Sequence, residues 1–504
     1  MILATYLLIG CYMALVLFFV IRGARATRSI EDYAVGSVAF SPWAVALSLA
    51  ASMTSAATFI INPGFVALYG VPALISFGLV LPAAALTSLV IFTKGFRRYG
   101  MSIKALTMAQ WIGTRYQSRY YALLFALLSL LLITFIVLIC VGITKVLATS
   151  LAANELYVLI GVVVFIFGYM MFGGANSMVY TNMAQALLMV VVAVILLGSG
   201  YEHFSAGVKG FLDSLAAIDP QLTAATYPES PLFRDFFEII FCQAVVGIAI
   251  VCQPHIITKS LLLKSDSDVN KFLTTAIVVE ILFFFVVFAG FYARLAFPEL
   301  TLNGEALPMD SIIPSYVVAE FPVFVGLIVV LGLISAGIST LEGLIQSLST
   351  TITSDILDQH LGHKLFAGED GGQKKVAVNK LVIVGLALLS FGFSYDQLVN
   401  PNLSVAIFAQ NGVYAYFSAA FIPVLFGTFL KDTPTIAPVA GTLTAVGVHF
   451  AVYYGGLTPY MEGSVRNPAI ASTLAILAAV VVAGSLYLTM RKRIEPVQPE
   501  TVGR

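Results

Sequence analysis

Thirteen apolar segments, most of them long enough to cross a lipid bilayer as a helix, run along this chain of 504 residues. A helix needs about 20 apolar residues to cross the hydrocarbon core. Hydrophobic residues make up 59% of the chain and charged residues only 10%, against roughly 25% charge in soluble domains. The sequence therefore predicts an all-α integral membrane protein, with residues 1–504 forming a single membrane domain that catalyses no covalent chemistry. Zero net charge and the lack of a basic stripe predict no nucleic-acid partner.

The predicted spans are separated by short polar segments. They are expected at about 2–21, 42–68, 71–93, 120–149, 154–173, 178–200, 236–262, 271–296, 315–354, 377–396, 403–430, 436–454 and 469–490. The ninth segment is too long for one span, so we expect it to begin as an external interfacial segment. The first segment is followed, not preceded, by arginines, which indicates a retained span and not a signal peptide.

Lysine and arginine are distributed very unequally between the two sets of connecting segments. If the N-terminus is outside, 21 of them fall in inner segments and four in outer segments, while Lys145 lies within the fourth span. Positive charge marks the cytoplasmic side of a membrane protein. We therefore predict a multi-pass protein of the plasma (inner) membrane, with its N-terminus outside and its C-terminus cytoplasmic.

Two predicted spans contain residues that interrupt a helix. The second span contains the run from Ala51 to Ser55, and the seventh contains Gly247 and Pro254. A membrane helix normally keeps its carbonyls bonded internally, so a break at bilayer depth frees oxygens that can hold a small cation. Corresponding breaks in two halves of a chain are typical of inverted-repeat transporters. For the seventh span, an ordinary proline kink is the alternative.

Five segments, in order along the chain, resemble the sodium–solute symporter family. They are residues 51–64, 172–174, 180–185, 253–259 and 336–341, and the resemblance covers essentially the whole chain. Residues 115–119 and 54–59 look most like the sodium/pantothenate branch, with the monocarboxylate branch close behind. The resemblance implies 13 transmembrane helices around a leucine-transporter-type 5+5 inverted-repeat core with broken helices. The repeats would occupy about 42–200 and 236–430, flanked by the spans at 2–21, 436–454 and 469–490.

The same resemblance implies a sodium site shared by the second and ninth spans. The matching positions are the backbone carbonyls of Ala51, Thr54 and Ala336, and the hydroxyls of Ser339 and Thr340. The three residues of the ninth span share one helix face, and hard cations prefer oxygen ligands. Taken alone, the hydroxyls would equally suit hydrogen bonds to carbonyls one turn earlier. Sodium is accordingly the expected coupling ion.

Contacts to a small organic solute are expected from both breaks and from the eleventh span. Comparison with the family places Gln410 toward the solute with Asn411 beside it, and Thr58 points to the same place. Gln253 and His255 lie at the second break. As alternatives, Gln410 and Asn411 would satisfy helix ends, and His255 would be a hydrogen-bonded core histidine.

Acidic residues within the spans are functional candidates, because ionisable groups are costly in a membrane. Family members with a second sodium resemble one another in having an aspartate in the sixth span and hydroxyls one turn beyond the first site. Here those places hold Asn182, Glu342 and Gly343, which implies one coupled sodium. Whether Glu342 or Glu280 couples a proton stays open at this point.

The expected function is sodium-coupled import of a small organic acid, such as pantothenate or a monocarboxylate, by alternating access. Because no lysine or arginine is expected at mid-depth in the pocket, a zwitterionic solute such as proline is an alternative. A membrane sensor related to transporters is the alternative from another class, and it would need a separate signalling partner.

Overall fold

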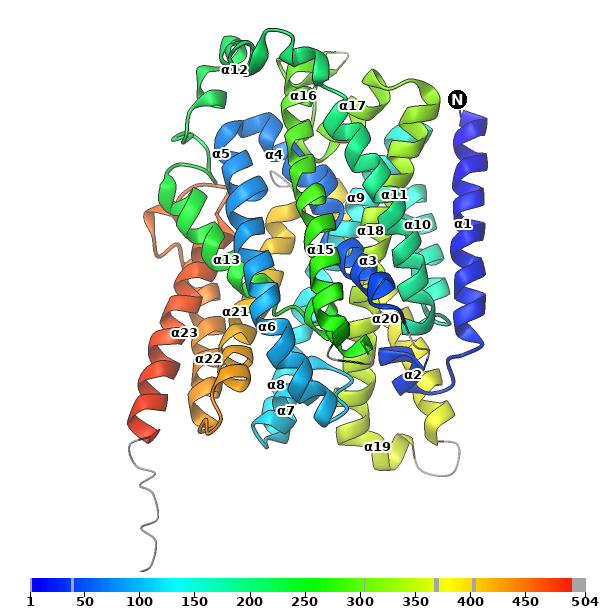
Figure 1. Cartoon of the computed structure of the whole chain (residues 1–504), viewed down its shortest axis with the longest axis vertical. Helices are drawn as coiled ribbons and strands as arrows, with labels where there is room; N and C mark the ends of the chain where they lie inside the picture. The colour runs from blue at the N-terminus through cyan, green and yellow to red at the C-terminus, as the bar shows by residue number, and fades with distance from the viewer. Residues whose placement is uncertain are drawn as a thin grey trace, which may run out of the picture.

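The fold is a bundle of helices that run between two opposite faces of the molecule (Figure 1). The computed structural model describes residues 2–37, 40–263, 265, 267–302, 304–366, 371–400 and 405–491. Within these ranges the exception to helix and loop is a hairpin of two strands, β1 (Thr301–Leu302) and β2 (Glu305–Ala306). The tail after Arg491, which we predict to be cytoplasmic, lies outside the described residues.

Within the described ranges, ten helical stretches are long and apolar enough to cross a membrane. They are α1 (Ile2–Ala24), α5 to α6 (Val71–Leu74 and Leu81–Ser102, joined by η2, Ile75–Val80), α8 to α9 (Arg119–Leu128 and Ile133–Leu151, joined by η3, Ser129–Leu132), α11 (Ala175–Gly198), α15 to α16 (Ser267–Phe285 and Ala289–Ala296, joined by η8, Val286–Phe288), α18 to α19 (Val323–Thr351 and Gln359–Leu365, joined by η10, Ile352–Asp358), α20 (Gly371–Val399), α21 (Val405–Phe429), α22 (Ile436–Gly455) and α23 (Pro468–Arg491).

Two further apolar stretches are bent sharply at short breaks. In the first, α3 (Pro42–Met53) meets η1 and α4 (Ala57–Ile61 and Asn62–Tyr69) at 56°. In the second, η6 and α13 (Phe237–Cys242 and Gln243–Ile250) meet α14 and η7 (Pro254–Ile257 and Thr258–Leu262) at 57°. Both predicted helix breaks are therefore confirmed. If each bent pair counts as one span, the described residues contain up to 12 spans. The shorter apolar helix α10 (Glu155–Met170) lies within the fifth predicted span, 154–173.

Local sequence explains where these broken helices begin and end. Ser41 caps α3 by accepting a hydrogen bond from the Ala44 amide, and Pro42 occupies the first turn. The helix ends where Thr54 takes an extended conformation, with φ −97° and ψ 95°. At the second break, Gln253 is extended because the following Pro254 disfavours helical backbone in the residue before it.

The ninth apolar segment is divided in two. The helix α17 (Ile312–Glu320) ends at Phe321, which is extended before Pro322, and α18 begins at Val323. The prediction that this segment is too long for one span, and that its first part is separate, agrees with this division. Most of α18 beyond Gly326 is buried, because this helix lies in the centre of the bundle (Figure 1).

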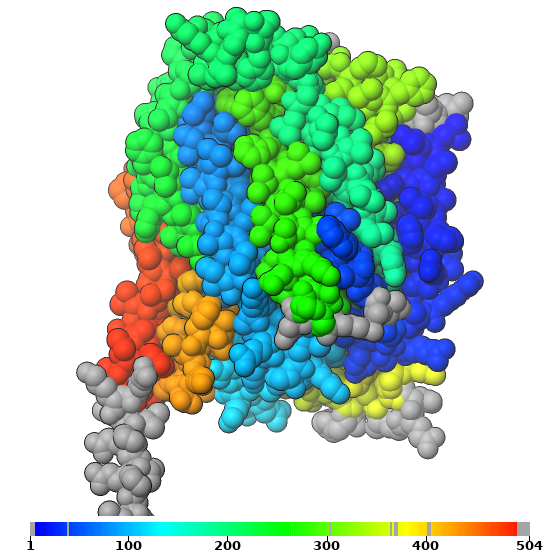
Figure 2. Space-filling model, viewed as in Figure 1, coloured from blue at the N-terminus to red at the C-terminus, as the bar shows by residue number. Residues whose placement is uncertain are grey.

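Short helices cover both ends of the bundle. The α12 helix (Gly207–Ile218) lies at the same end as the N-terminus, and Figure 2 shows the segment around it covering that end. At the opposite end, Arg115 of α7 (Met108–Arg115) donates to the carbonyls of Gly427, Leu430 and Lys431. Carbonyls at the C-terminus of a helix such as α21 lack backbone N–H partners, and an arginine can supply the hydrogen bonds. The remaining short elements are α2 (Ile30–Val35), η4 (Tyr201–Phe204), η5 (Pro220–Thr223), η9 (Met309–Ser311) and η11 (Pro459–Met461).

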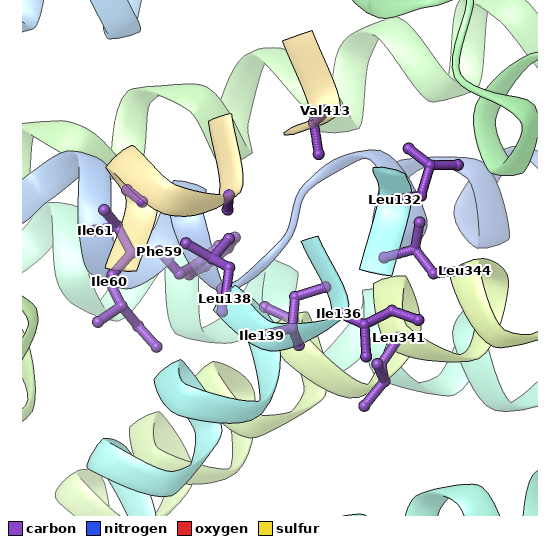
Figure 3. Packing of buried hydrophobic residues seen from close by; sticks show 14 of the residues in the cluster. Phe59, Ile60, Ile61, Leu132, Ile136, Leu138, Ile139, Leu341, Leu344 and Val413 are labelled. Carbon is purple, nitrogen blue, oxygen red and sulfur yellow. The ribbon is translucent and has the colours of Figure 1, made fainter. Parts of the chain in front are cut away.

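The far side of the first break is anchored by apolar packing. Figure 3 shows Phe59, Ile60 and Ile61 of η1 together with Leu138 and Ile139 of α9, and all five side chains are buried. The η1 segment also contacts α18. Because close-packed cores resist displacement, this packing holds the polar residues of the break at a defined place in the bundle.

Candidate functional site

Backbone and hydroxyl oxygens converge where α3 ends against α18. The Oγ of Ser339 donates to the carbonyl oxygen of Ala51 at 2.6 Å, and Oγ1 of Thr340 donates to the carbonyl of Ser52 at 3.0 Å. These carbonyls belong to the last turn of α3, where a helix runs out of internal donors. All four residues are fully buried.

The cluster contains more acceptor oxygens than protons. Ser339 also lies 3.1 Å and Thr340 3.3 Å from the carbonyl oxygen of Ala336, and Thr340 lies 3.4 Å from that of Ala51. Each hydroxyl carries one proton, yet each is within hydrogen-bond distance of at least two carbonyl oxygens. Hydrogen bonds one turn back and contacts across to α3 are therefore both present. An oxygen-rich, proton-poor cluster of this kind suits a small cation.

The structure thus brings together four of the five residues predicted for the sodium site: Ala51, Ala336, Ser339 and Thr340. It adds the carbonyl of Ser52, which the sequence analysis did not include. The hydroxyl of Thr54 is engaged elsewhere, 2.5 Å from the carbonyl oxygen of Ala50 and 2.9 Å from Oε2 of Glu280 on α15. The Thr54 carbonyl as a sodium ligand stays a prediction.

A pocket lies between the two breaks and α21. Four residues predicted to contact solute line it: Thr58, Gln253, His255 and Gln410. Its other polar lining residues are Ser55, Asn62 and Tyr414, and the rest are apolar, including Phe77, Phe135 and Phe284. Asn62 and Tyr414 were not predicted to contact solute. They lie four residues after Thr58 and Gln410, so helical periodicity is the signal that could have found them. The lining contains no charged side chain among the described residues.

Several polar atoms at the second break have no protein partner in the described part of the chain. They are Oε1 of Gln253 and both ring nitrogens of His255, and both side chains are buried. Buried polar atoms are nearly always hydrogen-bonded, because each unsatisfied one costs about 1–3 kcal/mol. The structure thus gives His255 no internal partner of the kind that a core histidine has. The arrangement favours a ligand that supplies the missing hydrogen bonds.

Asn411 differs from its neighbour Gln410. Its Nδ2 donates to the hydroxyl of Tyr454 at 2.9 Å, and its Oδ1 accepts from Nε2 of His449 at 3.0 Å. Asn411 does not line the pocket and instead joins α21 to α22. The structure therefore does not bring Asn411 into the pocket with Gln410, and its contact with solute stays a prediction.

Known proteins are similar to this chain both in sequence and in fold. The model of the sodium:solute symporter family matches residues 33–442. The chain belongs to the sodium:solute symporter family. The symporter is 28% identical to the sodium/pantothenate symporter of Escherichia coli (strain K12), over 88% of this chain and 89% of that protein. It is 26% identical to the sodium/pantothenate symporter of Haemophilus influenzae, over 77% of this chain and 78% of that one.

Solved structures show the same fold. The substrate-bound, outward-open state of a Na+-coupled sialic acid symporter matches with a TM-score of 0.78 at 17% identity, over 96% of this chain and 97% of that one. The manganese transporter of Eremococcus coleocola matches with a TM-score of 0.52 at 13% identity, over 92% and 95%. The predicted leucine-transporter-type fold is confirmed, with about 10 to 12 apolar spans in the part of the chain that the structure describes. Family membership confirms a transporter, not an enzyme, with sodium as its coupling ion.

Proposed function

We propose that the symporter imports a small organic acid, such as pantothenate or a monocarboxylate, together with one sodium ion. The observation that carries the proposal is the pocket between the two broken spans, in which Gln253 and His255 have buried polar atoms without partners. Two relatives that align over most of this chain are named sodium/pantothenate symporters, which supports an organic acid as the solute.

Sodium would bind where α3 ends against α18. The proposed ligands are the carbonyl oxygens of Ala51, Thr54 and Ala336 and the hydroxyls of Ser339 and Thr340, with the carbonyl of Ser52 in reach. This set is made of neutral oxygens, which suits a monovalent cation better than a divalent one. Sodium held between α3 and α18 would favour the outward-open state and be released inside, as the broken helices rock around the site.

The solute would lie against Thr58, Gln253, His255 and Gln410. Because the lining has no lysine or arginine among the described residues, the negative charge of a carboxylate would have to be stabilised by neutral hydrogen-bond donors and by the bound sodium. A zwitterion such as proline meets the same neutral lining without an unpaired net charge, and it is the second candidate for this reason.

The proposed architecture has 13 spans, with α10 as the fifth and the bent pairs as the second and seventh. Residues 1–504 would form one domain whose inverted repeats occupy about 42–200 and 236–430. Two breaks of 56° and 57°, five predicted spans apart, support the repeat. The lysine and arginine distribution supports an outside N-terminus and a cytoplasmic C-terminus. Reporter fusions at both ends, active on one side of the membrane only, test the orientation.

Uptake into proteoliposomes tests the function. Labelled pantothenate, a monocarboxylate and proline are compared with and without an inward sodium gradient. Accumulation of one acid that requires sodium is expected. Sodium-dependent accumulation of proline alone would select the second candidate. If no member of a wider metabolite panel is transported while some raise the melting temperature, the symporter acts as a sensor.

The electrical signature separates the two solute classes. One sodium moving with a monoanion carries no net charge, so a tenfold sodium gradient supports about tenfold accumulation, equivalent to about 1.4 kcal/mol. One sodium moving with a zwitterion carries one charge, and a potential of about 100 mV adds about 2.3 kcal/mol, which raises the limit to several hundredfold. A voltage-insensitive uptake is therefore expected for the organic acid.

A further inference from the structure

A second buried polar cluster lies beside the proposed sodium site. It consists of Lys259 on η7, Ser48 and Ser52 on α3, Asn182 on α11 and Glu342 on α18. All five are at most 3% exposed. Lys259 lies near the end of the predicted seventh span, 236–262, and its side chain is only 3% exposed.

Lys259 is surrounded by oxygen atoms. Its Nζ donates to Oγ of Ser48 at 2.7 Å and lies 3.4 Å from the carbonyl oxygen of the same residue. A third oxygen, Oδ1 of Asn182, lies 3.2 Å away when the carboxamide is oriented to accept from Lys259. In the opposite orientation the amide nitrogen would face the ammonium, and two donors would confront each other. The accepting orientation is therefore the one that the charge of Lys259 requires.

In this orientation Asn182 connects the ammonium to a carboxylate. Its Nδ2 donates to Oε2 of Glu342 at 2.9 Å, and its Oδ1 also accepts from Oγ of Ser52 at 3.0 Å. Glu342 accepts two further hydrogen bonds, from Tyr169 at 2.5 Å and from Thr181 at 2.7 Å. Three donors are what an ionised carboxylate needs when water is excluded.

The hydrogen bonds around Lys259 and Glu342 thus suit an ammonium and a carboxylate that are separated by a single amide. A buried charge is tolerated when it is paired and hydrogen-bonded, and removing one partner leaves the other uncompensated. Without the ammonium, the same place would offer the carbonyl and hydroxyl oxygens of Ser48, the amide oxygen of Asn182 and one net negative charge. Those are the ligand types that hard cations prefer.

We propose that the ammonium of Lys259 is the resident cation of a second cation site, so that this lysine limits the symporter to one transported sodium. The ammonium occupies the oxygen set of Ser48 and Asn182 and balances Glu342. The proposal rests on the proposed function only in that the first sodium binds at Ser339 and Thr340. It explains why a chain with a buried carboxylate next to its sodium site needs no second ion to neutralise it.

Equilibrium binding of radioactive sodium to the purified, full-length symporter in lipid nanodiscs tests the proposal. The unaltered protein is expected to bind one sodium per molecule. Lys259→Ala is expected to bind two, because it opens the site and leaves Glu342 unbalanced. Lys259→Arg, which keeps the charge, should bind one. A folded Lys259→Ala protein that still binds one sodium would overturn the proposal.

Two further variants separate the two sites. Adding Glu342→Gln to Lys259→Ala removes the uncompensated charge and should return the protein to one sodium. Adding Ser339→Ala to Lys259→Ala should weaken the first site and leave the second. If Ser339→Ala has no effect on sodium binding in the unaltered protein, the first site is wrong, whatever the result for Lys259.

Folding gives an independent readout if Lys259→Ala is unstable. The double variant Lys259→Ala with Glu342→Gln contains neither charge, so it should recover yield and melting temperature relative to Lys259→Ala. High sodium should also stabilise Lys259→Ala more than it stabilises the unaltered protein. If neither removal of Glu342 nor added sodium recovers a misfolded Lys259→Ala protein, then Glu342 is not the counter-charge of Lys259, and the proposal fails.

Discussion

The hydroxyl of Ser339 reaches the carbonyl oxygen of Ala51 at 2.6 Å, across 288 positions of sequence. One residue lies mid-way along the intact helix α18, and the other lies in the last turn of the broken helix α3. A hydroxyl proton now fills the space between them. A sodium ion at the same place would draw both oxygens to itself and join the two helices, so the occupancy of the cluster would control their relative position.

Replacing Ser339 or Thr340 with alanine removes one side-chain oxygen from the cluster. Each variant is expected to raise the sodium concentration for half-maximal uptake by about tenfold or more, equivalent to about 1.4 kcal/mol. Ser335→Ala is the matched control, because its hydroxyl lies on the same helix and donates to Tyr12 outside the cluster. Sodium dependence is measured in proteoliposomes after surface amounts are equalised. Equal half-saturation in all three variants would remove these hydroxyls from the sodium site.

Gln410 and Asn411 are neighbours with different surroundings, so alanine should lower solute affinity at one position and stability at the other. Gln410→Ala should raise the half-saturation for solute about tenfold and leave sodium binding without solute unchanged, because Gln410 lines the pocket. Asn411→Ala should instead lower stability by about 1–3 kcal/mol, because it leaves Tyr454 and His449 without their partner. Solute affinity and melting temperature are measured on both. A Gln410→Ala protein that loses stability but not affinity would make Gln410 structural.

The two fully buried histidines of the described chain offer a matched pair. His255→Leu should leave the melting temperature unchanged or raise it, because neither ring nitrogen has a protein partner to lose, and it should weaken solute binding. His449→Leu should lower the melting temperature by several degrees, because its Nε2 donates to Asn411, and it should not alter solute affinity. Thermal unfolding with and without solute is the measurement. Equal destabilisation by both substitutions would mean that His255 is a core histidine.

Substitutions at Thr54 distinguish the role of its backbone carbonyl from the role of its side-chain hydroxyl. Thr54→Val keeps the shape of the side chain and removes the hydroxyl that contacts Ala50 and Glu280, which should cost about 1–2 kcal/mol of stability. Thr54→Ser should recover most of this loss. Since the proposed sodium ligand is the Thr54 carbonyl, the sodium half-saturation should stay within about threefold in both variants. A much larger loss of sodium affinity in Thr54→Val would place the hydroxyl, not the carbonyl, in the site.

The sequence by itself determined the helices and where two of them break. Hydrophobic runs of bilayer length specify helices, because the chain must satisfy its own backbone hydrogen bonds in lipid. The breaks depend on equally local properties, namely a proline at 254 that forces Gln253 into an extended conformation and a run of small and hydroxyl residues before Ser55. The spacing of Ala336, Ser339 and Thr340 also placed the three on one face without knowledge of any partner.

Only the tertiary structure decided what those faces meet. The side chain of Gln410 enters the pocket, while Asn411, one position later, is rotated about the helix axis toward α22. The Ser52 carbonyl and the buried position of Lys259 depend on where α18 and α11 pack against α3. The hydropathy of a segment predicts that it crosses the membrane, but it does not predict how the helix is rotated about its own axis. That rotation is set by close packing against helices that are far away in the sequence.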